Sequence, residues 1–499
     1  MEFYQDGPEL KNTFDSDPFL KSYLQKKLPP ETFKVAAQHL AHLGERAVTD
    51  LLQFSIQAEA QLPVHVPYDP WGRRIDELRT SEAWKKLEVA AATEGIVGTA
   101  YDRKHGPFSR VYQMALLYLY HPSSAFFSCP LAMTDGAARA IELYGDDELK
   151  SRAFKNLTST DPKIFWTAGQ WMTERTGGSD ISGTTTTAEP FEEKKLFSST
   201  HALRGTKWFT SATTSQMAMT LARPLGAVEG SRGLSLFYLE LRDEKNNLRN
   251  IEIHRLKDKL GTKALPTAEL SLQGTPAKLV GGPGDGVKKI ASLFNVTRVY
   301  NAICALGQMR RALDLAQSYA RKRKAFGKYL IDHPLHALTL KDLETEFAKS
   351  FKLCFFVAEL LGKDECKTAS ENERLLLRAL TPILKLYTAK KSIQICSEVL
   401  ECFGGAGYVE DTGLPRLLRD SQVLAIWEGT TNVLSLDMLR AFQKENALPA
   451  VLEYLKKSNV DLSELNGLLA EAQKKGPEFQ ELSARRMAFL IAELIAQTL

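Results

Sequence analysis

A glutamate in an apolar setting is the first residue of this sequence whose surroundings suit chemistry. Glu428 follows Ile426 and Trp427 and precedes a glycine. Apolar surroundings raise the pKa of a carboxylate toward the value that a general base needs. A surface glutamate at a helix end has the same local sequence, so this segment alone does not distinguish a catalytic base from an ordinary residue.

Two segments near the middle of the chain combine hydroxyls with glycines or an aromatic ring. Thr173 and Ser179 flank a Gly-Gly pair, and such a turn lets backbone N–H groups approach a ligand oxygen closely. Further on, strand alternation puts Phe209 and Ser211 on one face, which suits a flat heteroaromatic ring that is stacked and hydrogen-bonded at its edge. The alternatives are a polar loop entering a β domain and ordinary core packing.

Glycine-rich stretches elsewhere read as helix ends and turns. Glycines after Phe403 end one helix and Pro415 opens the next, whereas residues 281–286 form a plain turn. The patterns GxGxxG, GxxxxGK(S/T), GxSxG and HExxH are absent, which disfavours a Rossmann domain, a P-loop nucleotidase, an α/β-hydrolase and a zincin. The close histidine pairs, His39/His42 and His333/His336, have no third ligand beside them, so we predict no metal site.

Hydrophobic patterns predict the elements that must position these residues. Residues 1–165 read mainly as helix, with Ser81 as an N-cap and a loop at residues 62–72, where three prolines prevent a helix. Period-2 runs such as Ser235–Glu240 indicate a small β barrel or sandwich. We predict an α+β fold in four parts: a helical domain at 1–165, a β domain at 166–286, a helical bundle at 287–443 and a helical extension at 444–499.

Composition and charge are ordinary for a globular protein of 499 residues, with 44% hydrophobic residues, 25% charged residues and a net charge of +4. No apolar run is long enough for a membrane span, and the small charge disfavours a strongly basic protein. The six cysteines form no CxxC pair, the N-terminus does not read as a secretory or mitochondrial signal, and the last three residues are not a peroxisomal signal. We therefore expect a cytoplasmic protein with free thiols.

Taken together and in order, these segments resemble the acyl-CoA dehydrogenase family over roughly residues 85–445. The family's first signature fits from Met172 to Gly183, and its second fits from Glu401 to Asp420. Lys259–Gly261 and Arg323–Gly327 match as well. The AidB-like (adaptive-response) branch is the most similar, on the residues Pro67–Asp76, Met309–Ala312, Pro334-Leu335 and Ile426–Gly429, and on additions at both ends.

The resemblance implies a helical domain, a β-barrel and a four-helix bundle, in homodimers paired into homotetramers, with FAD between barrel and bundle. It places FAD against residues of both parts: Gln170, Thr173, Ser179, Phe209, Ser211, Gly404, Gly405, Thr430 and Asn432. Arg323 and Phe326 would reach the FAD of a neighbouring subunit, with the guanidinium against the pyrophosphate.

By the same resemblance, Glu428 removes the α-proton of an acyl-CoA while the β-hydride goes to flavin N5, giving a 2,3-enoyl-CoA. Electrons would pass to an electron-transfer flavoprotein or another acceptor. The implied substrate contacts are Ser179, Asn295, Arg298, Trp427 and Gly429. This sequence departs from the family at Asn295, where an aspartate is common, at Pro334, where a glutamine is common, and at Trp427, where a tyrosine is usual.

Three alternatives remain open at this stage. A nucleic-acid-binding stress flavoprotein would need a basic C-terminal face, but residues 441–499 carry seven Lys or Arg and eight Asp or Glu, so nucleic acid is not the expected partner. An acyl-CoA sensor would keep the ligand without turnover. A nitroalkane-type flavin oxidase would have aspartate in place of Glu428.

Overall fold

Two groups of residues pack separately in the computed structural model, which describes residues 4–190, 201–458 and 460–499. The helical unit comprises Met1–Asp50, Asp102–Pro122 and Arg298–Leu499. The β unit comprises Leu51–Tyr101 and Ser123–Thr297. The predicted α+β fold is confirmed.

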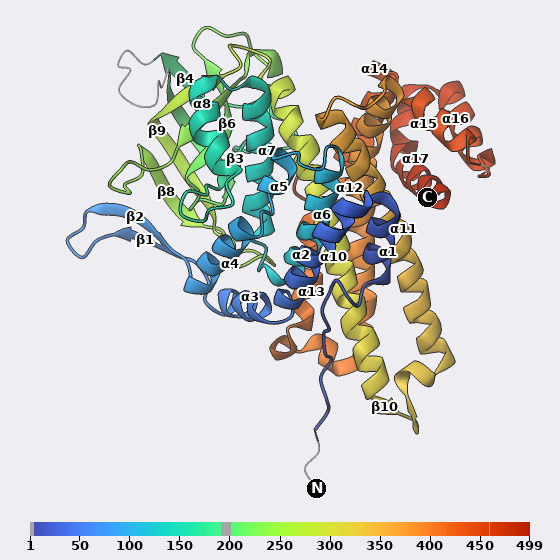
Figure 1. The fold of residues 1–499 in the computed structure, drawn as a ribbon. Helices are drawn as coiled ribbons and strands as arrows, with labels where there is room; N and C mark the ends of the chain where they lie inside the picture. Colours follow the sequence, from blue (N-terminus) through green and yellow to red (C-terminus); the bar gives the residue numbers. More distant parts are fainter. Residues whose placement is uncertain (1–3, 191–200, 459) are drawn as a thin grey trace. The chain divides into compact units, whose positions relative to one another are not determined.

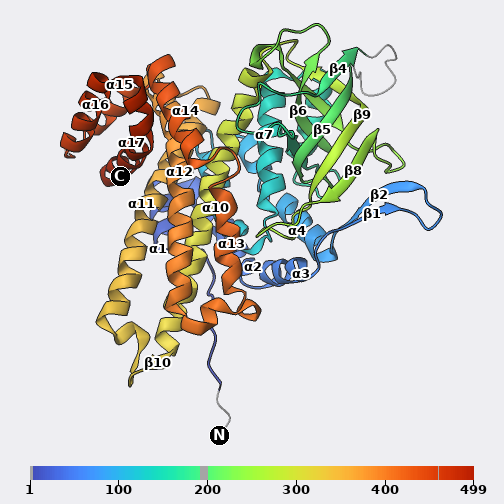
Figure 2. The same ribbon diagram turned by 180° about the vertical axis from the view of Figure 1, so that it is seen from behind.

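Long helices dominate the helical unit. The main ones are α1 (Pro18–Lys27), α2 (Pro30–Arg46), α6 (Phe108–Tyr120), most of α10 (Gly286–Lys322), α11 (Pro334–Glu365), α12 (Glu371–Cys402), α13 (Leu414–Leu424) and α14 (Thr431–Lys444). Helices α11 and α12 lie side by side along their lengths (Figures 1 and 2). The aromatic face of α11 is buried. Phe347, Phe351 and Phe355 recur every four residues and pack on one another and on Phe19 and Tyr23 of α1.

The C-terminal extension folds as three further helices of the helical unit: α15 (Leu448–Lys456), α16 (Ser463–Lys475) and α17 (Pro477–Thr498). Glu493 of α17 attaches the last helix to its neighbours. The Tyr387 hydroxyl of α12 donates to Glu493 Oε1 at 2.7 Å, and the Lys349 Nζ of α11 lies 2.9 Å from Glu493 Oε2. The extension therefore packs on the bundle and is not a detached tail.

Among the residues that the structure describes, the larger sheet of the β unit has seven strands: β3 (Ala168–Trp171), β4 (Thr187–Pro190), β5 (His201–Ser211), β6 (Met217–Pro224), β7 (Ser235–Glu240), β8 (Ile251–Leu256) and β9 (Thr267–Val280). The strand order is β3-β6-β4-β5-β9-β7, with β8 on β9. Strands β6 and β7 also pair with each other, which closes five strands into a ring. A barrel is therefore formed, and its core is built from residues such as Trp171, Leu203 and Phe237.

Helices precede and accompany the sheet within this unit: α3 (Asp50–Ala60), α4 (Glu82–Thr93), α5 (Gly98–Tyr101), α7 (Ser128–Tyr144), α8 (Asp147–Leu149) and α9 (Lys155–Leu157). Ser81 is the N-cap of α4 as predicted, because its hydroxyl accepts a hydrogen bond from Trp84 N at 3.1 Å.

The loop predicted at residues 62–72 is wrong for residues 64–68, which form a strand, and right for residues 62–63 and 69–72, which lie outside regular structure. Strands β1 (Val64–Tyr68) and β2 (Arg74–Arg79) pair there as an antiparallel hairpin. Prolines do exclude a helix, but Pro67 falls at the register shift between Val66 and Tyr68, where the ladder needs no N–H donor. In the part of the chain that the structure describes, no helix is both long enough and apolar enough to cross a membrane.

Candidate active site

Glu428 lies on a left-handed turn between α13 and α14. Its φ is +57°, and that of Gly429 is +104°. A non-glycine residue in this region of backbone space is held there against its own preference. A Cβ added to Gly429 would lie 2.9 Å from Leu434 Cδ2, so the second position of the turn requires glycine for both its φ and its packing. We call residues 427–430 the base turn.

Two cations of the helical unit hold the carbonyl groups of the base turn. Arg298 Nε of α10 donates to the Glu428 carbonyl oxygen at 3.3 Å, and Lys385 Nζ of α12 donates to the Gly429 carbonyl oxygen at 2.7 Å. These bonds come from two different helices, so they fix the backbone that carries the Glu428 carboxylate.

Arg298 is also part of an ion-pair network. Its Nη1 lies 2.6 Å from Asp437 Oδ2, and Arg378 Nη2 lies 2.8 Å from the other oxygen of the same carboxylate. Arg378 Nε also contacts Glu445 Oε1 at 2.8 Å. Burial raises the pKa of Asp437, but Arg298 and Arg378 lower it more, so the net shift is downward and the carboxylate is ionised. The guanidinium predicted to contact CoA is thus engaged here with Asp437 and with the Glu428 carbonyl.

Lys385 is fully buried in α12. Burial lowers the pKa of Lys385 to about 7, the nearby Glu428 carboxylate opposes that shift, and Arg298 adds to it. Sequence reasoning missed this residue. The available signal was a lysine inside the apolar run Ile383–Tyr387 of a helix.

Trp427 is positioned by an amide that sequence reasoning also missed. The Trp427 indole N–H donates to Asn301 Oδ1, and Asn301 Nδ2 donates to the Leu424 carbonyl at 3.2 Å. Asn301 comes three residues after Arg298 on α10, so the two share a helix face. That i, i+3 spacing was the signal that could have identified it.

The β unit brings together the predicted flavin residues of β3, the loop after it and β5. Trp208 N donates to the Thr173 carbonyl at 2.9 Å, and Trp171 Nε1 donates to the Ser211 carbonyl at 3.3 Å. A Cβ on Gly178 would lie 2.5 Å from Thr173 Oγ1, so the loop can take this path only with glycine there. We call residues 172–183 the flavin loop.

Features of this cluster fit a polar, flat cofactor such as FAD. Gln170 Oε1 is buried and has no hydrogen-bond partner within the described residues, which leaves an acceptor that a ligand could satisfy. The Phe209 ring is 52% exposed although it lies on a strand of the barrel, and Ser179 is exposed on the flavin loop. An exposed ring on β5 and a buried amide oxygen without a partner on β3 suit a ligand that both stacks and donates a hydrogen bond.

A buried ion pair anchors the flavin loop to the barrel. Lys207 Nζ of β5 lies 2.8 Å from Glu174 Oε1, and both side chains are almost completely buried. Thr185 and Thr186 donate to the same carboxylate through their hydroxyls, at 2.7 and 2.5 Å. Burial opposes ionisation, but Lys207 and these hydroxyls lower the pKa of Glu174 below its ordinary value.

The remaining predicted contacts do not gather at the base turn. Arg323 and Phe326 lie at the β10 end of the helical unit, opposite the α14 end (Figures 1 and 2). Gly404 and Gly405 belong to that same end, because the adjoining Phe403 ring stacks on Tyr319 of α10, with centroids 4.6 Å apart. Helical rise along α10 separates Arg298 from Lys322 by about 36 Å. Thr430 and Asn432, by contrast, are exposed beside Glu428.

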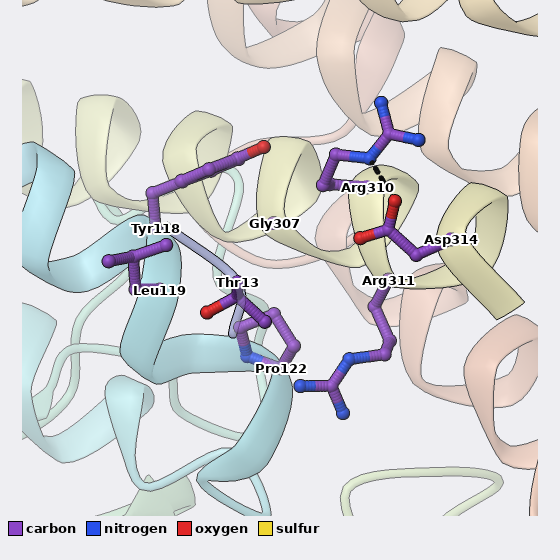
Figure 3. A pocket seen from close by; sticks show the side chains of 8 residues that line it. All are labelled: Thr13, Tyr118, Leu119, Pro122, Gly307, Arg310, Arg311 and Asp314. Atoms are coloured by element: carbon purple, nitrogen blue, oxygen red, sulfur yellow. Dashed lines mark hydrogen bonds and ion pairs between the residues drawn. The ribbon is translucent and has the colours of Figure 1, made fainter. Parts of the chain in front are cut away.

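One small cavity in the helical unit is not the site. It holds about 10 Å³, room for one water molecule at most, so neither a flavin nor a thioester fits. Figure 3 shows its charged wall, where Arg310 and Asp314 of α10 form an ion pair. Burial raises the pKa of Asp314 to about 6, against the effect of Arg310. The lining residues are Thr13, Tyr118, Leu119, Pro122, Gly307, Arg310, Arg311 and Asp314.

Metal ligands do not cluster in this chain as far as it is described: no group of three or more His, Cys, Asp or Glu residues could hold an ion. Asn295, the predicted substrate contact on α10, is half-buried in the β unit.

Models of known family domains match most of the chain between residues 7 and 442. The C-terminal domain of acyl-CoA dehydrogenase matches residues 284–442, and its middle domain matches residues 169–275. The N-terminal domain of the adaptive response protein AidB matches residues 7–161. The chain belongs to the acyl-CoA dehydrogenase family, whose members are FAD-dependent oxidoreductases, as the two signatures predicted.

Within that family the chain is similar to AidB-type members. Acyl-CoA dehydrogenase family member 11 of Caenorhabditis elegans is 43% identical over 100% of this chain and 85% of its own length. The putative acyl-CoA dehydrogenase AidB of Escherichia coli (strain K12) is 32% identical over 81% of this chain and 74% of its own length.

Solved structures agree with these relationships. The apo form of the protein Bd2924 has 65% identity and a TM-score of 0.98, covering 100% of this chain and 99% of that one. The Caenorhabditis elegans protein ACDH-11, solved in complex with C11-CoA, has 42% identity and a TM-score of 0.95, covering 99% of this chain and 88% of that one.

Proposed function

We propose that this protein converts a saturated acyl-CoA thioester into the 2,3-enoyl-CoA, with FAD as cofactor and Glu428 as the base. The observation that carries the proposal is the base turn, where a glutamate in a left-handed conformation is held by Arg298 and Lys385. Membership of the acyl-CoA dehydrogenase family supports it.

In the proposed reaction Glu428 takes the α-proton, which is too weakly acidic for a carboxylate in water. The backbone N–H of Glu428 donates to the thioester carbonyl and stabilises the negative charge that develops there. Exclusion of water by the substrate strengthens Glu428 as a base. FAD, when bound, supplies the acceptor for the β-hydride. Trp427 and Gly429 flank the base, and Ser179, Asn295 and Arg298 are the other proposed substrate contacts.

We propose that FAD is held by Gln170, Thr173, Ser179, Phe209 and Ser211 of one copy, with Thr430 and Asn432. The FAD of a second copy would be contacted by Arg323, Phe326, Gly404 and Gly405, because these residues lie about 36 Å along α10 from the base turn. The Phe326 ring is 98% exposed, which leaves it available to another subunit. The protein would thus work as a homodimer or homotetramer.

The electron acceptor, the cellular location and the domain bounds are proposed as well. The acceptor of the electrons would be an electron-transfer flavoprotein or another carrier. The location would be cytoplasmic, supported by cysteine thiols that form no disulfide in the described part of the chain. The domain bounds 1–165, 166–286, 287–443 and 444–499 are supported by the extents of the matched family models.

A second candidate is an acyl-CoA sensor that binds the ligand with little turnover. The observation that favours it is the similarity to ACDH-11, which is solved in complex with C11-CoA. Nucleic acid remains the weaker option, because cations of the extension are paired locally: Lys457 with Glu453, Lys475 with Glu471 and Arg486 with Glu464.

Anaerobic titration of the flavin with saturated acyl-CoAs of increasing length tests the proposal. We expect the oxidised-flavin absorbance to bleach in the natural protein and in Glu478→Gln, an exposed control on α17. In Glu428→Gln the thioester should bind without bleaching. Bleaching of Glu428→Gln at the natural rate, or folded protein that binds no flavin, would overturn the proposal. Tight binding with slow single-turnover bleaching in the natural protein would favour the sensor.

A further inference from the structure

Lys385 carries an ammonium group whose burial in α12 is energetically unfavourable. Its side chain is completely buried, and in the part of the chain that the structure describes it forms no salt bridge with a carboxylate. Burying an ammonium group costs several kcal/mol, whereas a methionine of similar volume would pack there without that penalty. Such a residue is a candidate for a functional role when it lies beside the site of reaction.

Within the described residues, its hydrogen bond goes to the base turn. Lys385 Nζ donates to the Gly429 carbonyl at 2.7 Å, on the residue that follows Glu428. The turn has a φ of +57° at Glu428, a conformation that side chains resist. An ammonium on the next carbonyl is therefore in a position to hold that conformation and the direction of the Glu428 side chain.

The two arginines near the base turn form ion pairs with carboxylates other than Glu428. Arg298 of α10 and Arg378 of α12 are neutralised by Asp437 of α14 and by Glu445 just after it. Glu428 and Arg298 are the charged groups that act on the Lys385 ammonium. Because a Coulombic interaction is mutual, Lys385 favours the ionised form of Glu428 as much as Glu428 favours the charged form of Lys385.

We propose that Lys385 is a positioning residue for the base: it holds the base turn through the Gly429 carbonyl and, in its charged form, favours the ionised Glu428 that accepts the substrate proton. This inference rests on the proposed function. It assigns a role to a lysine of α12, a helix that has no substrate contact in the proposed reaction.

Three substitutions separate the two parts of this role. Lys385→Met removes both the charge and the hydrogen-bond donor, Lys385→Gln keeps a donor without the charge, and Lys385→Arg keeps the charge. Lys456→Met, on the exposed face of α15, is the matched control. Each variant is compared with the natural holoprotein for flavin content, acyl-CoA affinity and the limiting rate of flavin bleaching as a function of pH.

We expect Lys385→Met to retain flavin and acyl-CoA affinity but to lose about 10²-fold in the limiting rate, the size of effect that follows a small misplacement of a reacting group. The acid limb of its pH profile should move up by about one unit, because a neighbouring positive charge is lost. Lys385→Gln should show that shift with a smaller loss of rate, and Lys385→Arg should recover part of the rate without the shift.

An NMR titration of carboxyl-labelled glutamate, with Glu428→Gln to identify the resonance, tests the same charge effect without turnover. Ionisation of Glu428 should move to higher pH in Lys385→Gln and Lys385→Met. An unchanged Glu428 titration in Lys385→Gln, or a natural bleaching rate and pH profile in Lys385→Met, would overturn the inference. If the natural protein does not bleach at all, the proposed function fails, while the NMR titration still decides the role of Lys385.

Discussion

Replacing Lys207 with methionine isolates the buried ion pair that anchors the flavin loop. In Lys207→Met, Glu174 keeps its threonine donors but loses its cation, and the Leu221 carbonyl loses the donor that now lies 3.0 Å away. Removing one partner of a buried pair costs about 3–5 kcal/mol. Because neutral hydrogen bonds to Glu174 remain, we expect the lower end of that range, about 3 kcal/mol.

A loss of about 3 kcal/mol corresponds to more than a hundredfold in the local opening equilibrium. Native-state hydrogen exchange of the amides of β5 measures this directly, because it reports on the β unit without assuming that the whole chain unfolds in one step. The double variant Lys207→Met/Glu174→Leu completes a double-mutant cycle with the two single variants. Replacing both partners by apolar groups should restore most of the lost stability.

The effect also has a pH signature. The folded-state pKa of Glu174 lies below its ordinary value of 4.5, so the pair stabilises the protein above pH 4.5, and this stabilisation falls as the pH drops toward the folded-state pKa. The natural protein should therefore lose more stability below pH 4.5 than the double variant does. A cost under 1 kcal/mol in Lys207→Met, or strictly additive effects in the cycle, would refute the reasoning.

Three smaller perturbations follow from other parts of the structure. Burial raises the pKa of Glu88 to about 6, so its ionisation destabilises the fold at pH values above the ordinary pKa of 4.5. Glu88→Gln should therefore leave the free energy of unfolding unchanged below pH 4.5 and raise it by about 2 kcal/mol above pH 6. Denaturant titration across pH measures this difference. Ser81→Ala should cost about 1 kcal/mol in the same assay, because Trp84 N loses its cap. Gly429→Ala should slow flavin bleaching in stopped-flow traces, since its Cβ meets Leu434 at 2.9 Å; an unchanged rate would mean that the turn tolerates a side chain.

The fold could be predicted where local pattern and final environment agree. Strand β7 occupies the predicted Ser235–Glu240, because its aliphatic and aromatic residues suit a strand that is buried on both faces. The hairpin of β1 and β2 could not be predicted from proline content, since a proline at a register shift is compatible with an edge strand and only the partner strand reveals it.

Some residues of the candidate site could be predicted from the local sequence and others could not. Glu428 was predicted as the base because it follows Ile426 and Trp427 in a segment that resembles the family, although that segment lies outside the two long signatures. Lys385 and Asp437 were not found, because their roles arise from contacts with Gly429 and Arg298, which are 44 and 139 residues away in the chain. Nothing in the local sequence of α12 or α14 records those partners.

The order of residues in the two units has a consequence for synthesis on the ribosome. The last residue of the β unit is Thr297, whereas the helical unit needs residues from the first stretch of the chain and from the last. At typical translation rates, the roughly two hundred residues after Thr297 take about 10–40 s to make. During that interval the barrel can already fold, while Phe19 and Tyr23 of α1 still lack the aromatic face of α11 on which they pack. A chain released before α17 is made would contain a folded barrel and an incomplete helical unit. That unit would lack Glu493, which contacts Tyr387 and Lys349 in the complete chain, and we expect chaperones to bind it.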